Sequence, residues 1–413
     1  MLQIDELENK INLICYNINN RGLLRYDPRD IDEWVNKVPY YKFKRIMSVF
    51  LQLLELINPY WVRRMIGSKK RLYPTTYTFL IESLICSRER LSLEYTVSEL
   101  IELCLHTYYA DNGWWKFKEN KSFYPIFQDM ERPSMPLYML ARCNNILARY
   151  GKNTQNKRLI CISEESLHYI FMHHKVSYYD DGTESISYYY NSDDCTINVN
   201  AEVVDWMCQL ERVMENEKYK KHFIKILKMI INEQNANGSW YYYSKRHMER
   251  YKLNGTIDCH HTASTLYNMI HVYETAYLDK KQKKKLENVI NNGMEYFLDN
   301  FFDENGKGIC IIGMKRRAST VQYSEALIAI GEYIRVFEEK NGKIVVKAKK
   351  LIDKVAVNII KLVKNDGSAP GDYKIWYINL DNINWGNGPA LYALTYYREY
   401  KRKCENKYEK KWI

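Results

Sequence analysis

Apolar residues recur at intervals of three and four positions along most of the chain, with polar and charged residues between them. In residues 221–234, KHFIKILKMIINEQ, the apolar side chains fall on one face of a helix (Phe223, Ile224, Ile226, Leu227, Ile230 and Ile231). Similar stripes occupy approximately residues 42–57, 77–87, 95–108, 135–150, 202–215, 262–277, 283–302, 323–338 and 343–364. Strand-like alternation is confined to short tyrosine-rich pieces such as SISYYY, residues 185–190. The pattern predicts an all-α fold.

Short turns that contain glycine separate the stripes at a nearly constant interval. They stand at Gly113, Gly182, Gly238, Gly306 and Gly367, with intervals of 69, 56, 68 and 61 residues. An earlier turn of this kind, in NNRGLLRYDP, is followed by a longer insertion. Glycine supplies the positive φ that a tight turn after a helix requires.

A period near 60 residues accommodates two helices and two loops, whereas the repeats of open helical solenoids run to about 34–47 residues. We therefore expect about six helical hairpins closed into an (α/α)6 toroid, with an open solenoid as the alternative. The glycine-bearing loops would emerge at one end of the ring and form a pocket there. The whole chain, 1–413, is predicted to be one domain. It comprises divergent N-terminal hairpins (1–110), regular repeats (111–400) and a basic tail (401–413).

Composition narrows the possible classes of protein. No run of 18 uncharged apolar residues occurs, so no membrane span is expected. The first residues, MLQIDELENKINLICYNI, carry acids early and do not resemble a signal peptide. The ten cysteines form no CxxC pair, and together these features predict a reduced, cytoplasmic protein. The net charge of +11 indicates either solvated helix faces or an anionic partner.

The segment from Gly238 to His261 contains the densest set of reactive side chains. Trp240 begins an aromatic patch, and Asp258 stands three residues before His261 at the start of the next helix. A carboxylate at this spacing can orient an imidazole or share a proton with it. The alternatives are a structural pair that only hydrogen-bonds the loop, and a metal site that also uses His260. Adjacent histidines point in different directions, which disfavours the metal site.

Three further clusters could bind or react with a ligand. Lys315, Arg316 and Arg317 form a cationic patch suited to carboxylates, sulfates or phosphates. Around Trp385, aromatic residues that include Trp376 and Tyr377 alternate with Asp and Asn, a combination suited to sugar rings. Each of these two clusters is alternatively a solvated loop edge or core filler.

The third cluster is the acidic pair Asp193 and Asp194 in NSDDCT. It distantly resembles the acid motif of class II terpene cyclases but lacks the first Asp of DxDD. Capping of the following helix is the plainer interpretation.

Several common motifs are absent from the sequence. It contains no GxxxxGK[ST], no GxGxxG, no HExxH and no GxSxG. Nucleotide, dinucleotide and zinc-protease chemistry are therefore disfavoured. We expect no cofactor, no metal and no nucleic-acid partner.

An ordered set of segments carries a family resemblance. The segments are RYDPRDI, RRMIGSKKRLYPTTYTFLIESL, SISYYYNSDDCTINVNAEVV, EQNANGSWYYY, IDCHHTASTL and NINWGNGPALYAL. In this order the chain resembles bacterial six-hairpin (α/α) proteins found among polysaccharide biosynthesis and modification enzymes. These are distantly similar to uronate epimerases, lyases and unsaturated glucuronyl hydrolases. The resemblance implies a toroid and a carbohydrate substrate.

These observations lead to a hypothesis of an enzyme acting on an anionic glycan or glycoconjugate, of epimerase, lyase or hydrolase type. Asp258 and His261 would transfer the proton, with Tyr188 as a partner acid. The substrate would be bound by Trp240, Trp385, Asn200, Lys315, Arg316 and Arg317. The alternatives are a terpene cyclase that uses Asp193 or Asp194 as its acid, and a toroid that binds a ligand without catalysis. The oligomeric state is not predicted.

Overall fold

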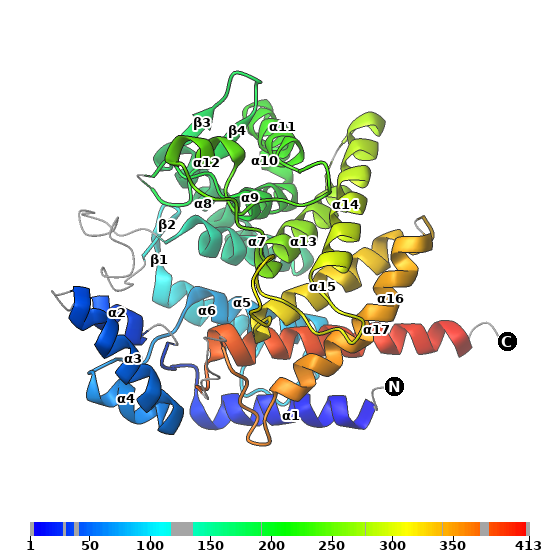
Figure 1. The fold of residues 1–413 in the computed structure, drawn as a ribbon. Coiled ribbons are helices and arrows are strands. Elements are labelled where there is room, and N and C mark those ends of the chain that lie inside the picture. Colours follow the sequence, from blue (N-terminus) through cyan, green and yellow to red (C-terminus); the bar gives the residue numbers. More distant parts are fainter. Residues whose placement is uncertain are drawn as a thin grey trace.

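The computed structural model describes residues 4–27, 30–36, 41–116, 135–190, 192–276, 278–340, 342–371 and 380–409. Its helices form two concentric rings (Figure 1). The inner helices are α5 (Pro74–Cys86), α7 (Leu137–Asn153), α9 (Ile197–Gln209), α13 (Cys259–Thr275), α15 (Thr320–Phe337) and α17 (Gly388–Glu409). Each inner helix packs against the next, and α17 packs against α5, so the ring is closed.

Six outer helices pack behind the inner ring. They are α6 (Val97–Tyr108), α8 (Lys157–His173), α11 (Glu217–Asn232), α14 (Lys280–Asn300), α16 (Gly342–Leu362) and α1 (Ile4–Arg21). The first five pair with the inner helix that precedes them, whereas α1 pairs with α17 at the other end of the chain. The predicted all-α toroid of six hairpins is confirmed.

Burial explains why the two rings differ in sequence. The helix α15 is buried along almost its whole length, because neighbours and the outer ring surround it. An outer helix such as α11 buries one stripe, which includes Phe223, Ile226 and Ile230, and exposes most of its lysines. Each predicted stripe coincides with a helix, and the 202–215 stripe divides into α9 and α10 (Glu211–Glu215). Within the described ranges, no helix combines the length and apolar composition that a membrane crossing requires.

The predicted glycine turns lie in the loops that lead from an outer helix to the next inner helix. All five, and Gly22 as well, have positive φ. Gly238 and Gly367 also lie against the backbone of the next outer helix. A Cβ on Gly238 would overlap the carbonyl of Asn292 in α14, and one on Gly367 would overlap that of Leu13 in α1. These turns are therefore the joints between neighbouring hairpins.

Strands are few among the described residues. The strands β1 (Tyr109–Asp111) and β2 (Trp114–Trp115) form one antiparallel pair. A second pair consists of β3 (Val176–Tyr178) and β4 (Glu184–Ile186). The tyrosines that follow β4 are not in a strand, so SISYYY is mostly loop. Both pairs lie in outer-to-inner loops.

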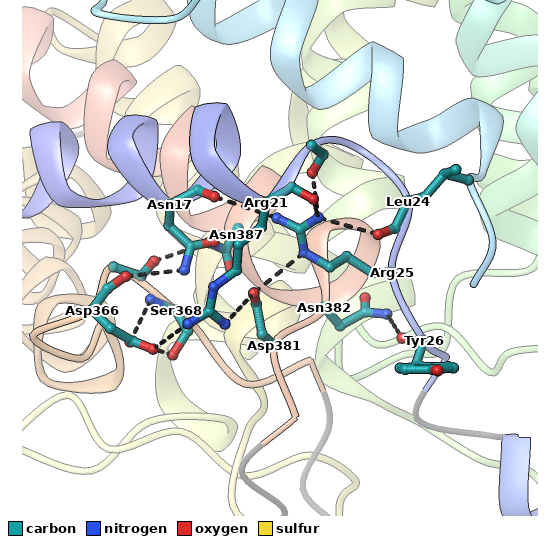
Figure 2. Close-up of polar contacts among 12 residues, drawn as sticks. Asn17, Arg21, Leu24, Arg25, Tyr26, Asp366, Ser368, Asp381, Asn382 and Asn387 are labelled. Carbon is teal, nitrogen blue, oxygen red and sulfur yellow. Dashed lines mark hydrogen bonds and ion pairs between the residues drawn. The ribbon is translucent and has the colours of Figure 1, made fainter. Parts of the chain in front are cut away.

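A polar network joins the two ends of the chain where the ring closes (Figure 2). The carboxylate of Asp381 accepts from Arg21 Nη1 at 3.0 Å and from Arg25 Nε at 3.3 Å. Asn387 donates to Asn17 at 3.2 Å. Asp381 and Arg25 are nearly inaccessible, so their attraction is weakly screened. Asn387 belongs to a π-helix, η2 (Ile383–Asn387), that precedes α17.

The loop between α1 and α5 carries the insertion expected after Gly22. It contains α2 (Asp30–Asn36), α3 (Tyr41–Ile57) and α4 (Pro59–Met65), which lie outside the rings in Figure 1. A bridge between Arg25 and Arg71 brings its ends together. Inside it, Arg63 is fully buried between Asp30 and Glu55. We call residues 23–72 the α2–α4 excursion.

Candidate functional site

Two adjoining cavities open at the end of the ring where the inner helices begin. Their volumes are about 390 and 250 Å³, and both are lined by His260, His261 and Trp385. The larger cavity is further lined by Tyr73, Tyr138, Met139, Tyr188, Tyr189, Asp194, Asn198, Tyr242 and Tyr243. The smaller is further lined by Asp258, Cys310, Ile311, Ser319, Val321, Gln322 and Gly371. All these residues lie at the start of an inner helix or in the loop before it, so the expected pocket lies at the loop end of the ring.

Asp258 and His261 form a close pair at the start of α13. Asp258 is the N-cap residue and accepts from the backbone N–H of His261 at 3.0 Å. Its other oxygen lies 2.6 Å from His261 Nδ1. Burial acts to raise the pKa of Asp258, but the contact with His261 outweighs it and holds this pKa below its ordinary value. The carboxylate therefore stays charged and fixes the orientation of the ring.

The ring of His261 remains accessible from the cavities. Its side chain is 30% exposed, and its ring contacts that of Tyr242 edge-on, with 4.3 Å between ring centroids. Among the described residues nothing hydrogen-bonds its Nε2. When Nδ1 donates to Asp258, Nε2 of the neutral ring carries the lone pair. This geometry suits a general base.

The adjacent His260 forms a second pair, with a carboxylate from the neighbouring inner helix. Its Nδ1 lies 2.6 Å from Glu325, which also accepts from Arg142 at 2.8 Å. Burial acts to lower the pKa of His260, but Glu325 outweighs it and raises this pKa. Burial likewise opposes ionisation of Glu325, yet His260 and Arg142 lower its pKa to about 2. The pair favours a cationic His260 beside His261, at 4.7 Å between ring centroids.

A third carboxylate lies deeper in the ring. Glu202 shares a cavity of about 20 Å³ with Arg142 and Glu325, enough space for about one water. Burial raises the pKa of Glu202 to about 7, although Arg142 acts to lower it. Glu202, Arg142 and Glu325 are not among the site residues predicted from the sequence. The signal in the sequence that could have identified them is a charged residue within an otherwise apolar helical stripe.

Aromatic side chains line most of the larger cavity. Tyr188 and Tyr189 contact each other edge-on with 4.5 Å between centroids, and Tyr242 and Tyr243 do so at 4.4 Å. Trp385 lies in η2 at the boundary of the two cavities. Rings of this kind present flat apolar faces together with polar tips.

Two predicted substrate ligands lie outside the cavities. Trp240 is only 2% exposed and donates from Nε1 to the carbonyl of Ile230 at 3.0 Å. Asn200 is fully buried, and its amide binds the backbone of Ile186 in both directions. Because Trp240 fills the core and Asn200 anchors β4, neither can contact a substrate, and these two expectations are withdrawn.

Only some of the predicted charged residues lie at the cavities. Lys315, Arg316 and Arg317 follow the loop that lines the smaller cavity, but none is among its described lining residues. Asp194 lines the larger cavity and accepts from the backbone of Tyr188 at 3.1 Å. Trp376 and Tyr377 lie outside the described residues.

Asp193 is not among the described residues that line the cavities. It accepts from Tyr251 and pairs with Arg250, both at 2.6 Å. The hydrogen bond from Tyr251, aided by Arg250, lowers the pKa of Asp193. This residue is therefore held as a carboxylate and is poorly suited to act as an acid.

No protein-family model and no curated protein matches the chain. Solved structures do match in fold. A possible member of the GH105 family from Salmonella enterica matches with a TM-score of 0.62 and 11% identity, over 96% of this chain and 95% of that one. A cellobiose 2-epimerase from Spirochaeta thermophila matches with a TM-score of 0.55 and 12% identity, over 79% and 85%. A glycosyl hydrolase of family 88 from Bacteroides vulgatus matches with a TM-score of 0.53 and 10% identity, over 80% and 91%.

These matches agree with the two closed rings of helices. The chain has the (α/α)6 toroid fold that these carbohydrate-active enzymes share. With 10–12% identity the similarity is one of architecture, and the chemistry of the site must be argued from the residues of this chain.

Proposed function

We propose that the protein is a carbohydrate-active enzyme that transfers a proton at a carbon of a sugar ring, as an epimerase or a lyase does. One observation carries the proposal: His261 is held through Nδ1 by Asp258 at 2.6 Å and faces a tyrosine-lined cavity. A positioned imidazole of this kind is a common general base. The structural neighbours act as supporting evidence, because their names describe a sugar epimerase and glycoside hydrolases.

The two histidines supply complementary roles. Neutral His261 takes a proton from carbon at Nε2, and Asp258 stabilises the imidazolium that forms. Cationic His260, held by Glu325, or the phenol of Tyr188 returns a proton to the substrate. An imidazole that accepts a proton beside a second group that donates one is the usual arrangement of a base and an acid.

Epimerase or lyase chemistry fits the residues better than hydrolysis by two carboxylates. Such hydrolases place a free acid and a free carboxylate on either side of the bond. Here the carboxylates among the described lining residues are Asp194 and Asp258. Asp258 is engaged with His261, and Asp194 with the backbone of Tyr188. Neither is free for that role.

The larger cavity suits an anionic group on the substrate. The helices α5, α7 and α9 begin at this cavity, and none has a side-chain cap at its N-cap residue, Tyr73, Pro136 or Thr196. The first N–H groups of α7 and α9 already donate to loop carbonyls, so these helix starts contribute mainly the positive end of the helix dipole. A uronate carboxylate placed there would be stabilised during proton abstraction, while Trp385 and the tyrosines bind the ring.

The alternatives receive less support. A terpene cyclase requires a protonated acid in a dry cavity, yet Asp193 lies outside the cavities, and the larger one contains Asn198, Asp194 and both histidines. A toroid that only binds a ligand would leave His261 enclosed by backbone partners. Its side chain is instead 30% exposed.

Solvent hydrogen exchange tests the proposal. The protein is incubated in D₂O with cellobiose or with a uronic acid disaccharide, and ring protons and products are followed by NMR. We expect one ring proton to exchange, together with formation of an epimer or of an unsaturated product. H261A should reduce the rate by about 10²–10⁴-fold. H168A, a histidine change on the outer helix α8, should leave it unaltered.

Other outcomes would contradict specific parts of the proposal. Exchange at an unchanged rate in H261A would remove His261 from the base role. Cleavage without exchange would identify a hydrolase instead. Failure of both sugars to bind or react, with a folded protein, would reject the carbohydrate assignment for these two substrate types.

A further inference from the structure

Exposed apolar side chains are concentrated on the α2–α4 excursion. Nine of the nineteen large apolar side chains exposed among the described residues lie between positions 43 and 65. They are Phe43, Ile46, Val49, Phe50, Leu53, Leu56, Ile57, Trp61 and Met65. A contiguous exposed apolar patch of this kind marks an interaction surface.

The helix α3 carries most of this surface on one face. Phe43, Ile46, Phe50, Leu53 and Ile57 follow one another at intervals of three and four, and each is more than half exposed. The opposite face is used internally: Leu51 is fully buried and packs in the small core of the excursion. The exposed stripe is therefore a second apolar face, which the toroid does not cover.

The exposed charges of the excursion are almost all positive. The carboxylates Asp27, Asp30, Glu33 and Glu55 are buried at 1–4% exposure. They are partnered inside the excursion, for example by Arg63 and Arg71. Asp32 is the one acid of residues 23–72 that reaches solvent, and only in part. The exposed cations among the described residues of the excursion are Arg45, Arg64, Lys69 and Lys70.

We propose that the α2–α4 excursion docks the protein on the surface of an anionic lipid bilayer. Apolar and aromatic side chains bordered by Lys and Arg, on a helix that lies in the interface, are the elements of such binding. The apolar stripe of α3 and Trp61 would enter the headgroup boundary, and Arg64, Lys69 and Lys70 would contact lipid phosphates.

Charge complementarity favours this partner over a second copy of the chain. A twofold contact would bring the same surface of two molecules together. Arg45, Arg64, Lys69 and Lys70 of each copy would then face like charges, with no exposed carboxylate opposite them except the partly exposed Asp32. An anionic surface removes that repulsion.

The excursion emerges at the same end of the ring as the candidate site. Its last residues lead directly to Tyr73, which lines the larger cavity. Tyr60 of α4 accepts at its hydroxyl from the backbone of Asp381, two residues before η2. Docking would therefore hold the cavity end beside the lipid surface. The docking proposal does not depend on the reaction proposed for the site.

Vesicle sedimentation tests the proposal with the full chain. The vesicles are pure phosphatidylcholine, or phosphatidylcholine with one-third phosphatidylglycerol, at low and physiological salt. We expect binding to the anionic vesicles only, weakened by salt. K69E/K70E should weaken it by at least 25-fold, because each Lys near an anionic surface contributes about a fivefold change in partitioning. I46S/F50S should also abolish sedimentation.

Control variants test whether a loss of vesicle binding is specific to the α2–α4 excursion. M172S/V346S removes two equally exposed apolar side chains elsewhere, and K280E/K281E reverses two cations on α14; both should bind vesicles as the wild type does. Circular dichroism and thermal unfolding establish that every variant is folded. The proposal is overturned if the wild type does not bind anionic vesicles, or if the excursion and control variants bind alike. It is also overturned if I46S/F50S converts a dimer to a monomer without any effect on lipid binding.

Discussion

Two adjacent histidines at the start of α13 receive different environments although they are neighbours in sequence. His261 is held by Asp258 from the same helix and borders the cavity. His260 is held by Glu325 from α15 and lies deeper. The first contact is local and the second requires the ring to be assembled. The different roles of the two histidines therefore depend both on the local geometry of the helix start and on the packing of α13 against α15.

Removing the charge that orients His261 should impair turnover more than binding. In D258N the residue can still accept from the His261 backbone, but its amide no longer favours the tautomer with a free Nε2 lone pair. We expect kcat on the substrate identified by exchange to fall by about 10²-fold or more, with KM changed little. Initial-rate kinetics measure this. If KM rose by a similar factor while kcat stayed unchanged, Asp258 would instead serve substrate binding.

Glu202 should make stability depend on pH. Its folded pKa of about 7 exceeds the ordinary value of 4.5 because burial disfavours the charged form. Between these values the folded state keeps a proton that the unfolded chain releases, so stability falls as pH rises through this window. E202Q cannot ionise and should unfold at a higher temperature than the wild type at pH 8, with a smaller difference at pH 5.

Calorimetry at the two pH values checks this expectation. E215Q, at an exposed position on α10, provides the matched control. Its unfolding temperature should differ from that of the wild type by the same amount at both pH values. A pH-independent effect of E202Q would mean that Glu202 has the same pKa in the folded and unfolded chains, so that burial does not raise it.

Among the structural elements, the glycine turns show how a local signal also serves packing. A positive φ explains why each turn contains glycine. At Gly367 the absence of a Cβ additionally lets the turn lie against Leu13 of α1, at the point where the ring closes. The repeat in the sequence indicated the need for a positive φ. The structure adds that the turn has no room for a Cβ.

G367A should therefore destabilise the protein strongly. The left-handed conformation costs alanine about 1–2 kcal/mol, and the overlap with the Leu13 carbonyl adds to it. We expect a loss of at least about 2 kcal/mol in the free energy of unfolding, measured by urea denaturation. G342A is the control, since no atom lies within 4 Å of its added Cβ and its φ is not positive. A similar loss in both variants would contradict this account.

At the scale of the whole molecule, the ring is closed by segments from opposite ends of the chain. The outer helix α1 covers α17, and Asp381 binds both Arg21 and Arg25 (Figure 2). Arg25 is 5% exposed, so it depends on this carboxylate for a counterion. The first helix therefore completes the sixth hairpin.

D381N should destabilise the protein where the ring closes. An Arg left buried without its counterion costs about 3–5 kcal/mol of stability. E102Q breaks the pair between Glu102 and Arg158, which are both more than half exposed, and should cost less than about 1 kcal/mol. Denaturation of the two variants side by side checks the difference. Equal losses would show that the Asp381 network adds nothing beyond a surface ion pair.

The sequence by itself determined most of the ring helices with their approximate boundaries, the hairpin period and the loops that carry the site, although no stripe was predicted for α1, α8 or α17. Helical periodicity and glycine turns are local properties, because they follow from backbone geometry and from which face of a helix is buried. Asp258 and His261 were also accessible to sequence analysis, since a spacing of three residues at a helix start brings them into contact.

Only the tertiary structure decided which of the other side chains meet. Trp240 and Trp385 look alike in sequence, yet one fills the core and the other lines the cavities. The contact between His260 and Glu325 joins residues 65 positions apart, and no local pattern encodes it. The partners of a residue on a closed ring depend on the rotation of each helix about its axis. That rotation is set by packing among all the neighbouring helices at once.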